Sequence, residues 1–156
     1  MKVSLIDNQD KVKLDMDLLK KVSEYVSGKF DRDPKSHLNI IFSSTEKIRE
    51  LNKKYRKVDS GTDVLSFSYI TDKEDISPVS GLHSVTIGEI FICPEVADSN
   101  ISDIDNDWNL TLELIMLIIH GILHIYNYDH IKEKDRVSME GIQDSILSDV
   151  KRTFGL

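Results

Sequence analysis

Three histidines in the second half of the chain have the spacing of a metal site. His120 and His124 are four residues apart, which places both side chains on one face of a helix, one turn apart. His130 lies six residues further on, so it reaches the same ion only if the helix ends and the chain turns back. Asn127 suits such a turn, because asparagine is second to glycine in tolerating the left-handed conformation that ends helices.

Three neutral imidazoles that leave a fourth position open are typical of a catalytic zinc site. Structural zinc sites are usually closed and rich in cysteine, whereas Cys93 is the only cysteine of this chain. Alternatively, the histidines are core residues with hydrogen-bond partners. Many aliphatic residues surround the pair, and burying an unpartnered polar group costs about 1–3 kcal/mol. We therefore predict one zinc ion (Zn2+) per chain, bound by His120, His124 and His130.

The residue after the first histidine restricts the chemistry. The same histidine spacing occurs in the metalloproteases called metzincins, which need a glutamate at that position as general base. Here the position holds Gly121, which cannot accept a proton. The pattern therefore indicates a metal site but does not favour proteolysis.

Charge is distributed unevenly along the chain. The formal net charge of −7 argues, taken alone, against a nucleic-acid partner. Residues 44–57, however, contain six basic and two acidic residues, a net charge of +4. A local basic element can contact phosphate on an acidic protein, although charge alone favours an ordinary solvated helix face.

The elements that must position these residues alternate between strands and helices. Strands are expected at residues 2–7, 37–42, 62–69 and 86–93, and helices at residues 15–28, 109–126 and 132–150, with a basic helix that begins after Ser43 or Ser44. The helix at 109–126 is apolar nearly all round and should be central. This order predicts one α+β domain over residues 1–156, α/β-like, with a small mixed sheet of about four strands and a metal cleft beside the central buried helix.

Further expectations concern side-chain placement. Cys93 should be a small buried residue, and the stretch 71–84 should be a surface loop. The inward residues of the basic helix are expected to be Ile48, Leu51 and Tyr55, and those of the last helix Val137, Met139, Ile142, Ile146 and Leu147.

The histidine string closely resembles the signature of the YbeY family of bacterial ribosomal-RNA maturation factors, His-Gly-x-Leu-His-Leu-x-Gly-Tyr-Asp-His. Asn127 stands where the family has glycine, and Ile125 where it has leucine. The resemblance covers about residues 36–147. The positions that carry it are His120, Gly121, Leu123, His124, Tyr128, Asp129 and His130, with Leu51, Asn52, Tyr55, Arg56, residues 62–67 and residues 88–90 in two earlier blocks.

This resemblance implies a zinc-dependent, single-strand-specific endoribonuclease of small-subunit ribosomal RNA maturation and ribosome quality control. The expected partners are single-stranded or ribosomal RNA and the ribosome or a ribosome-associated protein. Arg56 aligns with the family's functionally important arginine, and we expect it to hold the scissile phosphate, since its planar fork and permanent charge match that group. Two alternatives stay open, a non-enzymatic zinc-containing ribosome assembly factor and a metal-dependent hydrolase of another substrate.

We expect a cytoplasmic protein with no membrane partner. The N-terminal residues do not form a signal-peptide pattern, and the apolar run at 114–126 is shorter than the roughly 20 residues that span a bilayer.

Overall fold

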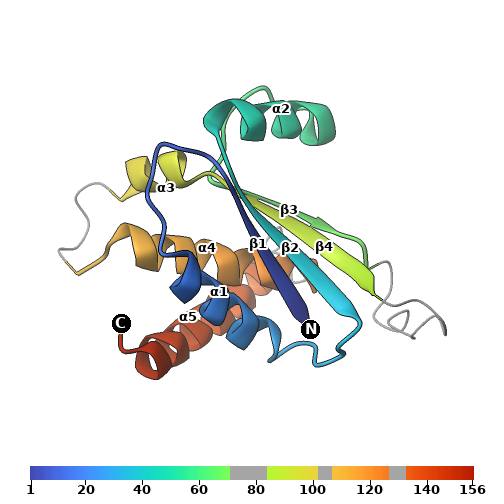
Figure 1. The fold of residues 1–156 in the computed structure, drawn as a ribbon, viewed down its shortest axis with the longest axis vertical. Coiled ribbons are helices and arrows are strands. Elements are labelled where there is room, and N and C mark those ends of the chain that lie inside the picture. Colours follow the sequence, from blue (N-terminus) through green and yellow to red (C-terminus); the bar gives the residue numbers. More distant parts are fainter. Residues whose placement is uncertain (71–83, 102–106, 127–132) are drawn as a thin grey trace.

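The computed structural model describes residues 1–70, 84–101, 107–126 and 133–156. These residues form a mixed sheet with helices around it (Figure 1). The elements are β1 (Lys2–Asn8), α1 (Met16–Ser27), β2 (Ser36–Ser43), α2 (Thr45–Arg56), β3 (Val64–Ser68), β4 (Val85–Ile92), α3 (Pro94–Asn100), α4 (Leu110–Ile125) and α5 (Glu133–Phe154).

The sheet has four strands in the order β1-β2-β4-β3. β1, β2 and β4 run parallel to one another, and β3 runs antiparallel to β4 at the edge of the sheet. The predicted α+β fold with a mixed sheet of about four strands is therefore confirmed. The short helix α3 was not predicted. It begins at Pro94, directly after the predicted strand at residues 86–93, and proline is well tolerated in the first turn of a helix.

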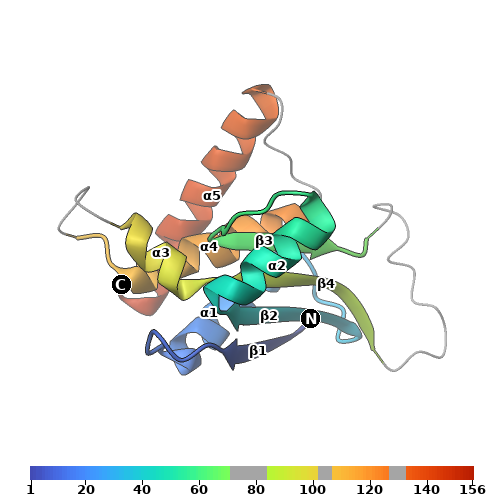
Figure 2. The ribbon, with the colours of Figure 1, turned by 90° about the horizontal axis from the view of Figure 1, so that it is seen from above.

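The two faces of the sheet differ in what covers them. Side chains alternate between faces along each strand, so Val3, Leu38 and Ile90 point to one face, which is buried under α1 and α4. We call this the helical face. α5 packs on the outside of α1 and α4 (Figures 1 and 2). No helix of the described residues is both long enough and apolar enough to cross a membrane.

The opposite face is covered only in part, and we call it the open face. α2 lies over one end of it, as the two ribbon views agree. Ile48 and Leu51 of α2 form a small buried cluster there with Leu65 of β3 and Cys93. Cys93 is thus buried, as predicted, and burial raises the pKa of its thiol.

Three of the helix starts that the sequence predicted, those of α1, α2 and α4, are capped by a side-chain oxygen. The cap accepts a hydrogen bond from the backbone N–H three residues later, which satisfies one of the donors left free at a helix N-terminus. The bonds join Asp15 to Leu18 at 3.1 Å, Ser44 to Lys47 at 3.2 Å and Asn109 to Leu112 at 3.0 Å.

Two predicted inward residues are instead exposed. Tyr55 is 56% exposed and Val137 is 60% exposed. Tyr55 lies in the last turn of α2, beyond the buried cluster around Ile48 and Leu51. Val137 lies in the first part of α5, which extends away from the other helices in Figure 2. Helical periodicity predicted the correct inward face of each helix. It did not predict where along the helix the neighbouring elements stop covering that face.

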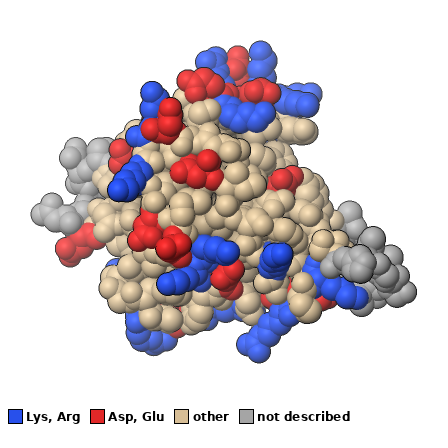
Figure 3. Space-filling model, in the orientation of Figure 1, with Lys and Arg blue, Asp and Glu red and all other residues tan. Residues whose placement is uncertain are grey.

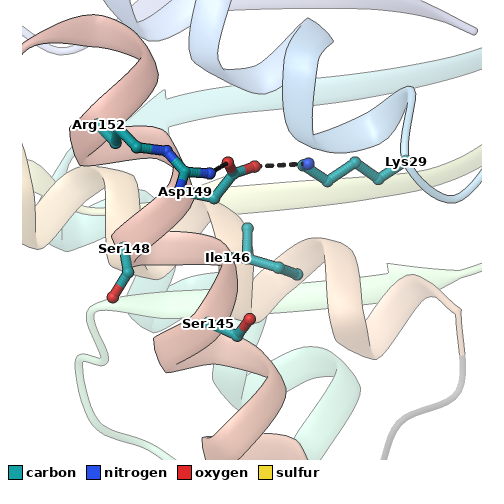
Figure 4. A pocket seen from close by; sticks show the side chains of 6 residues that line it. All are labelled: Lys29, Ser145, Ile146, Ser148, Asp149 and Arg152. Carbon is teal, nitrogen blue, oxygen red and sulfur yellow. Dashed lines mark hydrogen bonds and ion pairs between the residues drawn. The ribbon is translucent and has the colours of Figure 1, made fainter.

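Asp149 ties α5 to the segment that follows α1. Its carboxylate lies 2.6 Å from Lys29 Nζ and 2.7 Å from Arg152 (Figure 4), and it accepts a hydrogen bond of 2.8 Å from Tyr25. A cavity of about 530 Å³ beside this cluster is lined by Lys29, Ser145, Ile146, Ser148, Asp149 and Arg152. A second cavity, of about 550 Å³, is lined by Asp107 and Asn109, which precede α4, and by Leu156, which follows α5.

Candidate metal centre

α4 presents two of the three predicted ligands as one pair. His120 and His124 lie one turn apart, and their Nε2 atoms face each other at 3.0 Å. The ring centroids are 4.5 Å apart and the ring planes are inclined by 74°. The part of the chain described here includes no cluster of three metal-ligating side chains. The third predicted ligand, His130, lies outside the described residues, as do Asn127 and Asp129.

The histidine-bearing end of α4 is pressed closely onto the sheet. A Cβ atom on Gly121 would lie 2.8 Å from Cγ2 of Ile90, and one on Gly88 would lie 2.5 Å from Cδ1 of Ile125. The Ser68 hydroxyl donates a hydrogen bond of 2.6 Å to the backbone oxygen of Ile125. From the sequence, Gly121 was interpreted only as a residue that cannot act as the general base of a protease. In the structure it also allows α4 to pack closely beside β3 and β4.

Tyr126 closes the end of α4 on the side of α1. Its ring stacks on Phe30, with centroids 5.2 Å apart and planes inclined by 17°. Burial, and then the neighbouring Asp31, raise the pKa of the Tyr126 phenol, so this group is neutral. This contact limits the freedom of the backbone directly after His124.

Gln143 of α5 contacts the first histidine from the other side. Its Oε1 atom lies 3.0 Å from Nδ1 of His120. An Nδ1–H that donates to this carbonyl leaves Nε2 as the unprotonated nitrogen, which is the form of imidazole that binds a metal. Sequence reasoning missed Gln143. The signal was a polar residue on an apolar stripe, since Met139, Gln143 and Ile146 recur at helical spacing and both hydrophobic neighbours are buried.

The geometry of the pair suits a single small cation. Zinc–nitrogen distances of about 2.0–2.1 Å in a tetrahedral site place two ligand nitrogens about 3.3 Å apart. The two Nε2 atoms at 3.0 Å are within a few tenths of an ångström of that spacing. Both rings are half-buried, and a separation of 3.0 Å is also the length of a hydrogen bond between the two rings.

Arg56 is not brought into contact with this pair. It is the last residue of α2, it is exposed, and it makes no ion pair or hydrogen bond within the described residues. α2 packs on the open face of β3, whereas α4 packs on the helical face, so the edge strand β3 lies between Arg56 and the histidines. A substrate that meets both must reach across this edge.

The cavities near α5 do not belong to this site. Neither the cavity around Asp149 nor the cavity around Asn109 is lined by His120 or His124. Their location therefore gives no reason to move the candidate site away from the histidine pair.

Comparisons with known proteins point to one family. The sequence model of the family "Endoribonuclease YbeY" matches residues 4–151. A protein of that name from Ureaplasma parvum serovar 3 is 36% identical over 134 residues, 86% of this chain and 80% of the relative. One from Oceanobacillus iheyensis is 31% identical over 151 residues, 96% of this chain and 97% of the relative.

A solved structure has the same fold. The solution structure of TM1509 from Thermotoga maritima superposes with a TM-score of 0.66 at 29% sequence identity. The match covers 97% of this chain and 91% of that chain. The arrangement of strands and helices around the histidine pair is thus shared with a protein solved independently.

Proposed function

The chain belongs to the YbeY endoribonuclease family, and on that premise we propose that it is a zinc-dependent, single-strand-specific endoribonuclease. Membership of the family supports an endoribonuclease, whose substrate is RNA. We further propose that it acts in the cytoplasm, in maturation of small-subunit ribosomal RNA and in ribosome quality control, with the ribosome or a ribosome-associated protein as its partner.

The observation that carries the metal proposal is the convergence of His120 and His124. Their Nε2 atoms face each other, and Gln143 engages the remaining nitrogen of His120. These two histidines, with His130 as the third ligand, would hold the zinc ion. Zinc bound there would supply a Lewis acid that polarises a phosphate oxygen.

Side chains of the protein would bind the negatively charged substrate and position it. Arg56 presents a permanent positive charge with no competing acid bonded to it among the described residues. We propose that it binds the scissile phosphate and offsets the negative charge that develops there. Arg49 on the same helix is already bonded to Asp59 at 2.8 Å and is less available for this role.

The test is cleavage of a single-stranded RNA by purified protein whose zinc content has been measured. His124→Ala should abolish cleavage, and Arg56→Ala should lower the rate about 100- to 1,000-fold while zinc content and folding are unchanged. Arg49→Ala is the matched control, because it removes the same charge from the same helix, and it should lower the rate far less.

Each result has a definite meaning. Cleavage that survives in both His124→Ala and Arg56→Ala would come from a contaminating nuclease. Equal losses in Arg56→Ala and Arg49→Ala would show that only the overall charge of α2 matters and would contradict the role of Arg56. Absence of cleavage by fully zinc-loaded protein with ribosomal RNA and ribosomes present would contradict the proposal.

A further inference from the structure

Exposed aromatic rings lie together on the open face, beside the end of α2. Tyr55 is 56% exposed and Tyr69 is 52% exposed. The ring of Phe67 lies between β3 and α2, with its centroid 5.3 Å from that of Tyr55 and 5.9 Å from that of Phe91. We call Tyr55, Phe67 and Tyr69 the aromatic strip. Single exposed apolar residues are ordinary, whereas a contiguous exposed patch often marks an interaction site.

Strand geometry places the rings of the strip on the same face. Phe67 and Tyr69 are two residues apart, so both project to the open face about 7 Å apart along the strand. The backbone N–H of Tyr69 donates to the oxygen of Ile87 at 2.9 Å and continues the pairing of β3 with β4. The Tyr69 hydroxyl donates to Glu89 at 2.6 Å, and this bond, with partial burial, raises the pKa of Tyr69 to about 12. The ring is therefore neutral and held in place.

The rest of the open face offers hydrogen-bonding groups. Strand register aligns Ser4, Asn39, Glu89 and Phe67 in one row across the four strands. The neighbouring His37 lies 2.8 Å from the Ser4 hydroxyl. The only acid of this row, Glu89, accepts the hydrogen bond from the Tyr69 hydroxyl.

At the same end of α2, three cations have no acidic partner among the residues that the structure describes. Within the described part of the chain, Lys47, Arg49 and Lys53 are paired with acids, whereas the exposed Lys54, Arg56 and Lys57 form no ion pair. Lys54 Nζ lies 5.2 Å from the centre of the Tyr55 ring. Figure 3 shows basic side chains over α2 at the top of the view, with acidic side chains among them.

The aromatic strip and the cations beside it match a ligand that has both unpaired bases and phosphates. Unpaired bases stack on aromatic side chains, and their phosphates attract Lys and Arg. A base-paired duplex hides its bases and would not use the rings. The complementarity is local, because the rest of the protein is acidic and repels RNA.

We propose that the aromatic strip, flanked by Lys54, Arg56 and Lys57, binds unpaired bases of single-stranded RNA next to the point of cleavage. This inference rests on the proposed function and deepens it. The RNA strand stacks on the open face, passes Arg56, and crosses the edge strand β3 to the histidine pair on the helical face. The strip thereby provides a preference for single-stranded RNA.

The test is the affinity for a fluorescein-labelled single-stranded RNA, measured by anisotropy with the full chain. His124→Ala serves as the background so that cleavage does not interfere. Tyr55→Ala and Tyr69→Ala should each weaken binding about tenfold or more, whereas Tyr55→Phe should retain the affinity. Lys20→Ala is the control for charge, because it removes an exposed cation of α1 on the other side of the sheet. It should leave the affinity unchanged. A duplex of the same length should bind equally to all of the tyrosine variants.

The outcomes separate this inference from the proposed function. Unchanged affinity in the double variant Tyr55→Ala, Tyr69→Ala overturns the inference even if the wild type cleaves RNA. If that variant keeps its affinity for the single-stranded RNA but loses binding to ribosomal protein freed of RNA, the strip binds a protein and the RNA assignment is wrong. If the tyrosine variants bind RNA weakly but zinc-loaded wild type cleaves none, the strip is supported and the proposed activity fails.

Discussion

Oε1 of Gln143 lies 3.0 Å from Nδ1 of His120, while Nε2 of the same histidine faces His124 at 3.0 Å. The two nitrogens of the His120 imidazole thus have different partners, one on α5 and one on α4. A partner on the outer nitrogen fixes the tautomer and the ring orientation, which is how proteins usually prepare a metal-binding histidine. α5, which packs on α4 and α1, is connected through Gln143 to the candidate site.

Gln143→Ala should weaken zinc binding about 10- to 100-fold, because loss of such an outer partner typically has that effect. Gln143→Glu should retain most of the affinity, since a carboxylate can accept the same hydrogen bond. Zinc affinity can be measured by competition with a chromophoric chelator. Asp144→Asn, an exposed neighbour on α5, is the control and should bind zinc like the wild type. Equal affinities for all four proteins would show that Gln143 has no part in metal binding.

Zinc should stabilise the folded chain, because the proposed ligands converge only when it is folded. A free zinc concentration 100 times the dissociation constant adds about 2.7 kcal/mol, which corresponds to a rise of roughly 5–10 °C in the unfolding midpoint for a chain of this size. A thermal scan with zinc or with a chelator measures the shift. His124→Ala should lose it, whereas His37→Ala, which removes a histidine of the open face, should keep it. A shift that persists in His124→Ala would place the ion elsewhere.

The sequence predicted the framework of the site because its signals are local. Asp15, Ser44 and Asn109 cap helices through bonds that span only three residues, and the apolar character of α4 required a central position. His120 and His124 share one helix, so their spacing alone brought them together. These relationships need no knowledge of how distant segments pack.

Contacts between distant segments were not predictable in the same way. Gln143 and His120 are 23 residues apart on different helices, and nothing in either helix specifies their relative rotation. The exposure of Tyr55 was also missed, because periodicity defines the inward side of α2 but not how far the sheet beneath it extends. The position of Arg56 relative to the histidines depends on the same tertiary arrangement.

Gly121→Ala should destabilise the protein, because the new methyl group would lie 2.8 Å from Ile90 Cγ2. Gly141→Ala is the matched control, since nothing lies within 4 Å of a Cβ atom at that position of α5. Replacing glycine by alanine inside a helix should stabilise it by about 0.5–1 kcal/mol. Urea unfolding of the two variants should therefore differ by about 1–3 kcal/mol, the usual cost of overpacking. If the two gain stability equally, the contact between α4 and β4 is looser than the structure indicates.

Asp149 should make stability depend on pH in the acid range. Hydrogen bonds from Lys29, then Tyr25, then Arg152 lower the pKa of its carboxyl from 3.8 to about 2. The folded state therefore binds this proton less readily than the unfolded state, so the stabilisation is complete above pH 4 and is lost as the pH falls towards 2. The urea midpoint of Asp149→Asn should lie below that of the wild type at pH 7 and 5, and the difference should shrink between pH 4 and pH 2. Asp144→Asn, which removes an exposed carboxylate with no ion pair among the described residues, should show no such convergence. A difference between Asp149→Asn and wild type that is constant down to pH 2 would mean that the stabilisation by this cluster does not come from the ionised carboxylate.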